Sequence, residues 1–193
     1  DFLYPNPASV LAFIENHDTD RFLGEGQNLA MLKQATTLLL TTRRIPQLYY
    51  GTEIMMNGVK TKSDGYVRCD FPGGWAGDKQ NAFTAEGRTE LQNECYNFYK
   101  TILNWRKGND VIAKGSMTQF MVQNGVYAYA RQYEGKTVFV MLNGTDSETT
   151  LPLKFYKEIL KDTKQGKDIL TGRTISFTED LKMAARESLV IEL

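Results

Sequence analysis

The chain has 193 residues with 23 basic and 23 acidic side chains, so its formal net charge is zero. Without an excess of clustered Lys and Arg, it lacks the electrostatic footprint of a protein that binds nucleic acid or an anionic membrane surface. Its apolar share of 41% indicates a globular chain with a true core and excludes intrinsic disorder.

The cysteine and histidine content excludes one further class of site. Cys69, Cys95 and the single histidine, His17, cannot complete a four-ligand zinc site, so we expect no structural zinc. A disulfide between the two cysteines is compatible with an oxidising compartment, and the localisation is left open among periplasmic, secreted and cytoplasmic. No apolar run reaches the roughly 20 residues that cross a bilayer. The start at Asp1, without Met, suggests a fragment or processed product.

The first half reads as strand, helix, strand. Residues 10–14 are a continuous apolar run, typical of a parallel strand covered on both faces. Residues 27–42 carry apolar side chains three or four apart, which predicts an amphipathic helix. Residues 47–50 predict a second strand. The length of chain between the two predicted strands suits a right-handed βαβ crossover.

A long connection and a second helix come next. Residues 57–85 are rich in Gly, Asp, Asn and Lys, and connections of that length are usually functional or disordered. A helix is predicted from Arg88, with Gly108 just past its end. One stripe of this helix is expected to serve in packing, namely Leu91, Cys95, Phe98, Ile102 and Trp105.

From Met117 onward, the apolar residues alternate with polar ones in short runs separated by turn residues, as in β-strands. Asn124-Gly125 predicts a type I′ hairpin between two strands. The pattern indicates a small antiparallel β-sandwich, and we place the domains at residues 1–110 and 111–193. Even spacing puts three aromatic side chains on one strand face, where core packing is favoured over a sugar-binding surface: Tyr127, Tyr129 and Tyr133.

The first half cannot be complete as an isolated sheet. Two parallel strands with two helices leave both strand edges and much of each helix stripe without partners. We therefore expect this half to be part of a larger barrel. If the chain is produced alone, its unpaired edges predict self-association or exchange of elements between copies.

Candidate functional side chains lie directly after the first predicted strand. His17 lies between Asn16 and Asp18, at the end of a buried strand where α/β barrels collect active-site groups. The alternative interpretation is that Asp18 or Thr19 only caps a short helix and that His17 is an ordinary loop residue.

Three segments resemble one known family. F-I-E-N-H-D, beginning at Phe13, resembles the fourth sequence motif of the alpha-amylase family of glycoside hydrolases, and D-T-D-R-F-L is similar to its neopullulanase and cyclomaltodextrinase branch. R-I-P-Q-L-Y-Y-G-T-E resembles the eighth barrel strand of that family and the turn after it. Asp64 to Arg68 resembles its Asp-x-x-x-Arg loop, with Gly65 in place of the usual proline.

The resemblance implies a fold class for the whole chain. It implies the C-terminal part of a (β/α)8 TIM barrel, carrying strands seven and eight, followed by the small antiparallel β-sandwich of the family. The tyrosines of the second predicted strand, Tyr49 and Tyr50, could stack on sugars, but on a barrel strand one of them is expected in the core.

The resemblance also implies roles for individual residues. Asp18 would stabilise the oxocarbenium-like transition state, and His17 would donate a hydrogen bond to a hydroxyl of the same sugar. Asp64 and Arg68 would hold hydroxyls of a sugar further toward the non-reducing end, the alternative being a solvated ion pair. Trp75, in a glycine-rich loop, is a candidate platform for a sugar ring.

Retaining hydrolysis needs a nucleophile and a general acid roughly 5–5.5 Å apart. In this family they follow the fourth and fifth strands, which we expect to lie upstream of residue 1. The resemblance therefore implies a retaining α-glucan hydrolase acting on starch-derived oligosaccharides or pullulan, of which this segment alone is inactive. We expect no cofactor, since the chain carries neither a dinucleotide nor a phosphate-loop motif. The alternative function is a non-catalytic carbohydrate-binding module.

Overall fold

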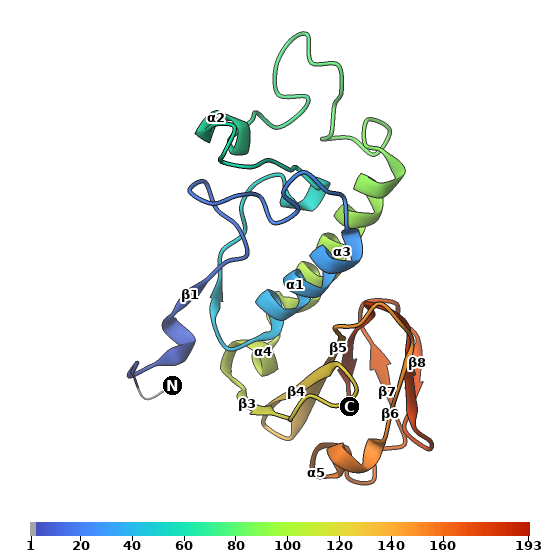
Figure 1. Ribbon diagram of the computed structural model, residues 1–193. Helices are drawn as coiled ribbons and strands as arrows, with labels where there is room; N and C mark the ends of the chain where they lie inside the picture. Colours follow the sequence, from blue (N-terminus) through green and yellow to red (C-terminus); the bar gives the residue numbers. More distant parts are fainter. Residues whose placement is uncertain (1–2) are drawn as a thin grey trace.

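A short parallel pair of strands and one helix open the structure, a computed structural model that describes residues 3–193 (Figure 1). Strand β1 (Leu11–Ala12) pairs in parallel with β2 (Ile45–Pro46), and helix α1 (Leu29–Thr41) connects them. The predicted order of strand, helix and strand is confirmed. The predicted bounds, 10–14 and 47–50, are wrong, because with a single partner each strand forms only a two-residue ladder.

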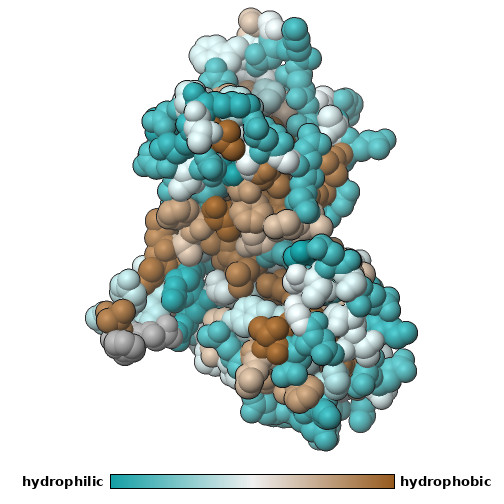
Figure 2. Space-filling view, viewed as in Figure 1, coloured by the Kyte–Doolittle hydropathy of each residue, from teal (hydrophilic) through white to brown (hydrophobic). Residues whose placement is uncertain are grey.

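The outer surface of this pair is not covered within the described residues. Leu11 is 52% exposed and Ile45 is 50% exposed, so the prediction of strands buried on both faces is wrong for this chain. Figure 2 shows the result as a brown, hydrophobic belt across the middle of the molecule. The expected lack of packing partners in this half is confirmed.

Helix α3 (Glu90–Arg106) packs along α1 and forms the core of the first half (Figure 1). A capping box fixes its start: the Thr89 hydroxyl accepts from the Gln92 N–H, and the Gln92 side chain accepts from the Thr89 N–H. On the predicted stripe, Cys95 and Ile102 are fully buried. Tyr99, which the stripe missed, is also buried, and its hydroxyl lies 2.7 Å from that of Thr36 on α1.

The second half is dominated by antiparallel sheet. A six-stranded sheet has the order β3-β4-β5-β10-β7-β8, and a second sheet pairs β6 with β9. Their bounds are β3 Ser116–Gln119, β4 Val126–Tyr133, β5 Lys136–Asn143, β6 Thr149–Leu151, β7 Gln165–Asp168, β8 Thr174–Ser176, β9 Leu181–Met183 and β10 Ser188–Glu192. Short helices complete the structure: α2 Asp64–Val67, α4 Asp110–Lys114, α5 Lys157–Leu160 and three 3₁₀ turns at Pro7–Ser9, Thr52–Ile54 and Leu153–Tyr156.

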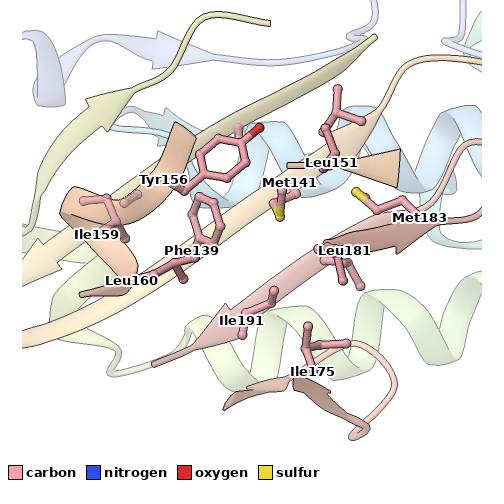
Figure 3. Close-up of a cluster of buried hydrophobic side chains, with 14 residues drawn as sticks. Phe139, Met141, Leu151, Tyr156, Ile159, Leu160, Ile175, Leu181, Met183 and Ile191 are labelled. Atoms are coloured by element: carbon pink, nitrogen blue, oxygen red, sulfur yellow. The ribbon is translucent and has the colours of Figure 1, made fainter. Parts of the chain in front are cut away.

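The central strands of the larger sheet are buried on both faces. Along β5, Phe139 and Met141 face the β6–β9 sheet and α5, as Figure 3 shows, whereas Val138 and Val140 face α4. Alternate side chains of a strand point to opposite faces, so a strand covered on both sides reads as one unbroken apolar run. The predicted antiparallel sandwich is present.

The predicted hairpin turn at Asn124-Gly125 and the predicted helix end at Gly108 are both present in the structure. Asn124 and Gly125 have φ of 49° and 76°, and Gln123 bridges Val126 across them, as a type I′ hairpin requires. Gly108 has φ of 77° directly after the Lys107 cap of α3, so the predicted helix end is confirmed.

The three tyrosines of β4 belong to the core and its margin. Tyr129 is fully buried, with its hydroxyl 2.5 Å from that of Thr41. Tyr127 and Tyr133 are partly buried against the same cluster. The expectation of core packing for this face is confirmed.

Arg131 ties the two halves together. Its guanidinium is buried and donates to the carbonyl oxygens of Thr41 at 2.9 Å, Ile112 at 2.9 Å and Gly115 at 2.7 Å. Burial lowers the pKa of this arginine to about 10. Thr41 ends α1, so this side chain fixes the first half to the sheet. The division at residue 110 remains a prediction.

The two cysteines are free in this structure, with Cys69 exposed and Cys95 buried in the α1–α3 core. The disulfide that the sequence left open is therefore not formed. Burial raises the pKa of the Cys95 thiol to about 12. None of the helices within residues 3–193 has the length and apolar character needed to cross a membrane.

Thiol labelling tests this arrangement. Because the thiolate is the reactive form, we expect one thiol, that of Cys69, to react with a disulfide reagent in the native chain at neutral pH. Both should react after denaturation without reductant. Native protein with no reactive thiol, and two released only by reduction, would contradict the free state of both cysteines.

Candidate functional site

His17 and Asp18 lie on a turn that follows β1 by a few residues. The Asn16 side-chain oxygen accepts from the Asp18 N–H at 2.7 Å, and the Thr19 hydroxyl accepts from the Asn16 N–H at 3.0 Å. No helix begins at this turn in the described chain, so the alternative of a helix cap at Asp18 or Thr19 is wrong. The side chains of His17 and Asp18 are held outward, 60% and 62% exposed.

The second loop, after β2, brings Asp64 and Arg68 to the same place. One guanidinium nitrogen, Nη2 of Arg68, lies 3.1 Å from Asp18 Oδ1 and 3.1 Å from Asp64 Oδ2. The Arg68 Nε–H donates to the His17 carbonyl at 2.9 Å, and His17 Nε2 lies 3.2 Å from Asp18 Oδ2. We call these four residues the Asp18 cluster. The structure thus brings together four of the five residues that the sequence singled out.

Lys60 joins this cluster and was missed by sequence reasoning. Its Nζ lies 3.2 Å from Asp64 Oδ1 and donates to the Asp18 carbonyl at 3.0 Å, while its backbone N–H donates to Asp20 Oδ1 at 2.6 Å. The hydrogen bond from Lys60, together with the Arg68 charge, lowers the pKa of Asp64 below its ordinary value of 3.8. Lys60 lies in a turn before α2, where the four-residue spacing rule of helices does not apply, so no local pattern marked this pair.

A buried ion pair lies beneath the Asp18 cluster. Arg21 Nη1 lies 3.1 Å from Glu15 Oε1, and the two side chains are 0% and 2% exposed. The other Glu15 oxygen accepts from the Phe22 N–H at 2.5 Å, and the Thr52 hydroxyl donates to Oε1. Both residues stand in the motif around Asp18, but nothing in their spacing showed that they pair.

Arg21 connects this pair to both loops of the site. It donates to the Tyr50 carbonyl at 2.7 Å and to the Val67 carbonyl at 3.0 Å, and Val67 directly precedes Arg68. The guanidinium carbon stands 4.0 Å and 4.9 Å from the ring centres of Tyr49 and Tyr50. Neither tyrosine is buried, so the expectation that one belongs to the core is wrong: both rings cover the arginine instead.

Trp75 is held separately, in the long connection. It is 68% exposed, and its backbone N–H donates to Asp78 Oδ2 at 3.2 Å. The four residues of the Asp18 cluster are linked to one another by hydrogen bonds and ion pairs, whereas the Trp75 backbone is fixed within its own loop.

The described residues contain no group of three or more His, Cys, Asp and Glu side chains arranged to hold a metal ion. The cluster instead combines exposed carboxylates, a guanidinium and an imidazole, which can accept from and donate to several hydroxyl groups at once. Such a set suits a polyhydroxylated ligand.

One family model and several known proteins are similar to this chain. Residues 117–192 match the family model of the cyclo-malto-dextrinase C-terminal domain. An alpha-amylase of Niallia circulans is 32% identical over 84% of this chain and 29% of its own length. A cyclomaltodextrin glucanotransferase of Bacillus sp. (strain 6.6.3) is 31% identical over 87% of this chain and 22% of its own length.

The fold is similar to those of solved relatives. A maltogenic alpha-amylase of Thermotoga neapolitana superposes with a TM-score of 0.74 at 16% identity, over 100% of this chain and 43% of that one. The chain thus spans less than a third of the two curated relatives and less than half of this solved one. On these matches, residues 117–192 resemble the cyclo-malto-dextrinase C-terminal domain, and the chain as a whole is similar to a part of alpha-amylases and cyclomaltodextrin glucanotransferases.

Proposed function

We propose that the chain supplies the Asp18 side of the active site of a retaining α-glucan hydrolase of neopullulanase type, which cleaves starch-derived oligosaccharides or pullulan. The observation that carries this proposal is the Asp18 cluster. Two loops that follow neighbouring parallel strands join His17, Asp18 and Asp64 to Arg68 in one network of hydrogen bonds and ion pairs. Barrels of this kind gather their catalytic groups on such loops.

Each side chain has a role in this proposal. Asp18 accepts hydrogen bonds from hydroxyls of the sugar at the cleavage point and stabilises the positive charge that develops on its ring. His17 donates to a hydroxyl of the same sugar. Asp64, which remains ionised to lower pH than an ordinary aspartate, and Arg68 hold the next sugar toward the non-reducing end. Trp75 offers its exposed ring as a stacking surface.

The nucleophile and the general acid are proposed to come from outside residues 1–193, on further strands of the same barrel. Those strands would cover the apolar face at Leu11 and Ile45. They would also enclose the Asp18 cluster, where a fixed charge stabilises a transition state far better than in open water. We propose the division into residues 1–110, as barrel, and 111–193, as β-domain. Alone, the chain is inactive and its exposed apolar face favours self-association.

A reducing-sugar assay on maltoheptaose and pullulan tests this function. We expect no release of sugar by the 193-residue chain and clear release by a longer protein that contains it together with the upstream strands. Cleavage by the 193-residue chain itself would place the missing carboxylates within this sequence. A longer protein with no activity on either substrate would overturn the assignment as a glucan hydrolase.

A further inference from the structure

Residues 71–83 form a narrow excursion from the long connection, which we call the arm. Its two ends lie together: the Ala82 N–H donates to the Pro72 carbonyl at 2.9 Å, and the rings of Phe71 and Phe83 stand 4.6 Å apart. In Figure 1 this green segment after α2 projects from the end of the molecule opposite the β-sheets.

The tip of the arm is braced by one carboxylate. Asp78 Oδ2 accepts from the Gly73 N–H at 2.7 Å and from the Trp75 N–H at 3.2 Å. Gly73 has φ of +102°, and a Cβ there would lie 2.7 Å from the Cα of Asn81, so only glycine fits. The backbone of Trp75 is therefore fixed although its side chain is exposed.

The base of the arm is anchored to α3. Arg88 donates to the Ala82 carbonyl at 2.9 Å and stands 3.9 Å from the ring centre of Tyr96. The Gln80 side chain donates to the capping residue Gln92 at 2.7 Å. These contacts hold the arm in one conformation before any ligand arrives, which reduces the entropy lost on binding.

The arm holds two aromatic rings in solvent. Trp75 is 68% exposed and Phe83 is 63% exposed, the highest values for aromatic side chains in residues 3–193. Exposed polar residues, among them Lys79 and Asn81, stand between Trp75 and Phe83 in the chain. A flat exposed ring can stack on the apolar face of a sugar, and amide and ammonium groups on the same arm can donate to its hydroxyls.

We propose that the arm is an additional binding site for an α-glucan chain, with Trp75 and Phe83 each stacking on a glucose ring. The inference rests on the proposed function and extends it: the arm holds a part of a long glucan other than the sugars at the Asp18 cluster. It assigns a role to Phe83, and it makes long glucans better ligands than short ones.

Native electrophoresis of the 193-residue chain in gels with and without amylopectin tests the arm directly. We expect amylopectin to retard the unaltered chain, and Trp75→Ala and Phe83→Ala each to weaken that binding about threefold to tenfold. Phe155→Ala is the matched control, because Phe155 is an exposed aromatic of the β-rich half and its loss should leave the retardation unchanged. Circular dichroism confirms that each variant is folded.

The outcomes separate this proposal from the proposed function. The arm is overturned as a glucan site, even if the longer protein cleaves glucans, if the unaltered chain is not retarded or if both arm variants are retarded as strongly as the unaltered chain. Retardation that depends on Trp75 and Phe83 supports the arm, and it does so even if no longer form is catalytically active.

Discussion

Asp18→Asn is expected to lower kcat of the longer, active protein by about 10²–10³-fold, the loss typical when one transition-state-stabilising group is removed. Asparagine keeps the shape of the side chain and an oxygen that can accept from Arg68 at the position now 3.1 Å away. The charge alone is lost. Because that charge acts mainly on the positive sugar ring of the transition state, kcat and kcat/KM should fall together, with little change in KM.

Asp146→Asn is the matched control for this substitution. Asp146 pairs with Arg186 in the β-rich half, at 2.7 Å, and its side chain is exposed. The same chemical change there should leave kcat and KM on maltoheptaose unaltered. An Asp18→Asn enzyme that keeps kcat within about threefold of the unaltered protein would show that no transition-state charge is stabilised at this position.

Elements with local signals could be predicted from the sequence. The period of α3, the glycine at its end, Gly108, and the turn at Asn124 depend on residues close together in the chain, so local pattern suffices. The meeting of Asp18 with Arg68 could also be foreseen, because loops after neighbouring parallel strands meet at one edge of a sheet.

Features built from long-range partners could not be predicted in this way. Arg131 donates to carbonyl oxygens of Thr41 and Ile112, and a carbonyl carries no sequence signature. The bounds of β1 and β2 failed for a related reason: a strand's length depends on its neighbours, and each has one here. The Glu15–Arg21 pair was hidden because both residues read as part of a polar loop.

In the buried pair of Glu15 and Arg21, each charge compensates the other where water cannot reach. Arg21→Met should lower the free energy of unfolding by about 3–5 kcal/mol, since removal of one partner leaves the other charge buried and uncompensated. The carbonyls of Tyr50 and Val67 would also lose a donor. Urea unfolding of the 193-residue chain, followed by circular dichroism, measures the change.

A double substitution distinguishes the buried charge from the lost packing of a long side chain. Glu15→Gln with Arg21→Met removes both charges, so the double variant should be more stable than Arg21→Met alone. Lys33→Met is the control, because Lys33 pairs with the exposed Glu94 at 2.6 Å and such pairs contribute at most about 1 kcal/mol.

The consequence reaches the Asp18 cluster because Arg21 holds the carbonyl of Val67, the residue before Arg68. Without Arg21, the Val67 carbonyl loses its hydrogen-bond donor and the backbone before Arg68 is no longer fixed. Arg68 should then no longer be held against Asp18. Since His17 is the single histidine of the chain, its imidazole resonances report this change without overlap. An Arg21→Met chain with unaltered stability and unaltered His17 resonances would show that the pair neither stabilises the fold nor positions the cluster.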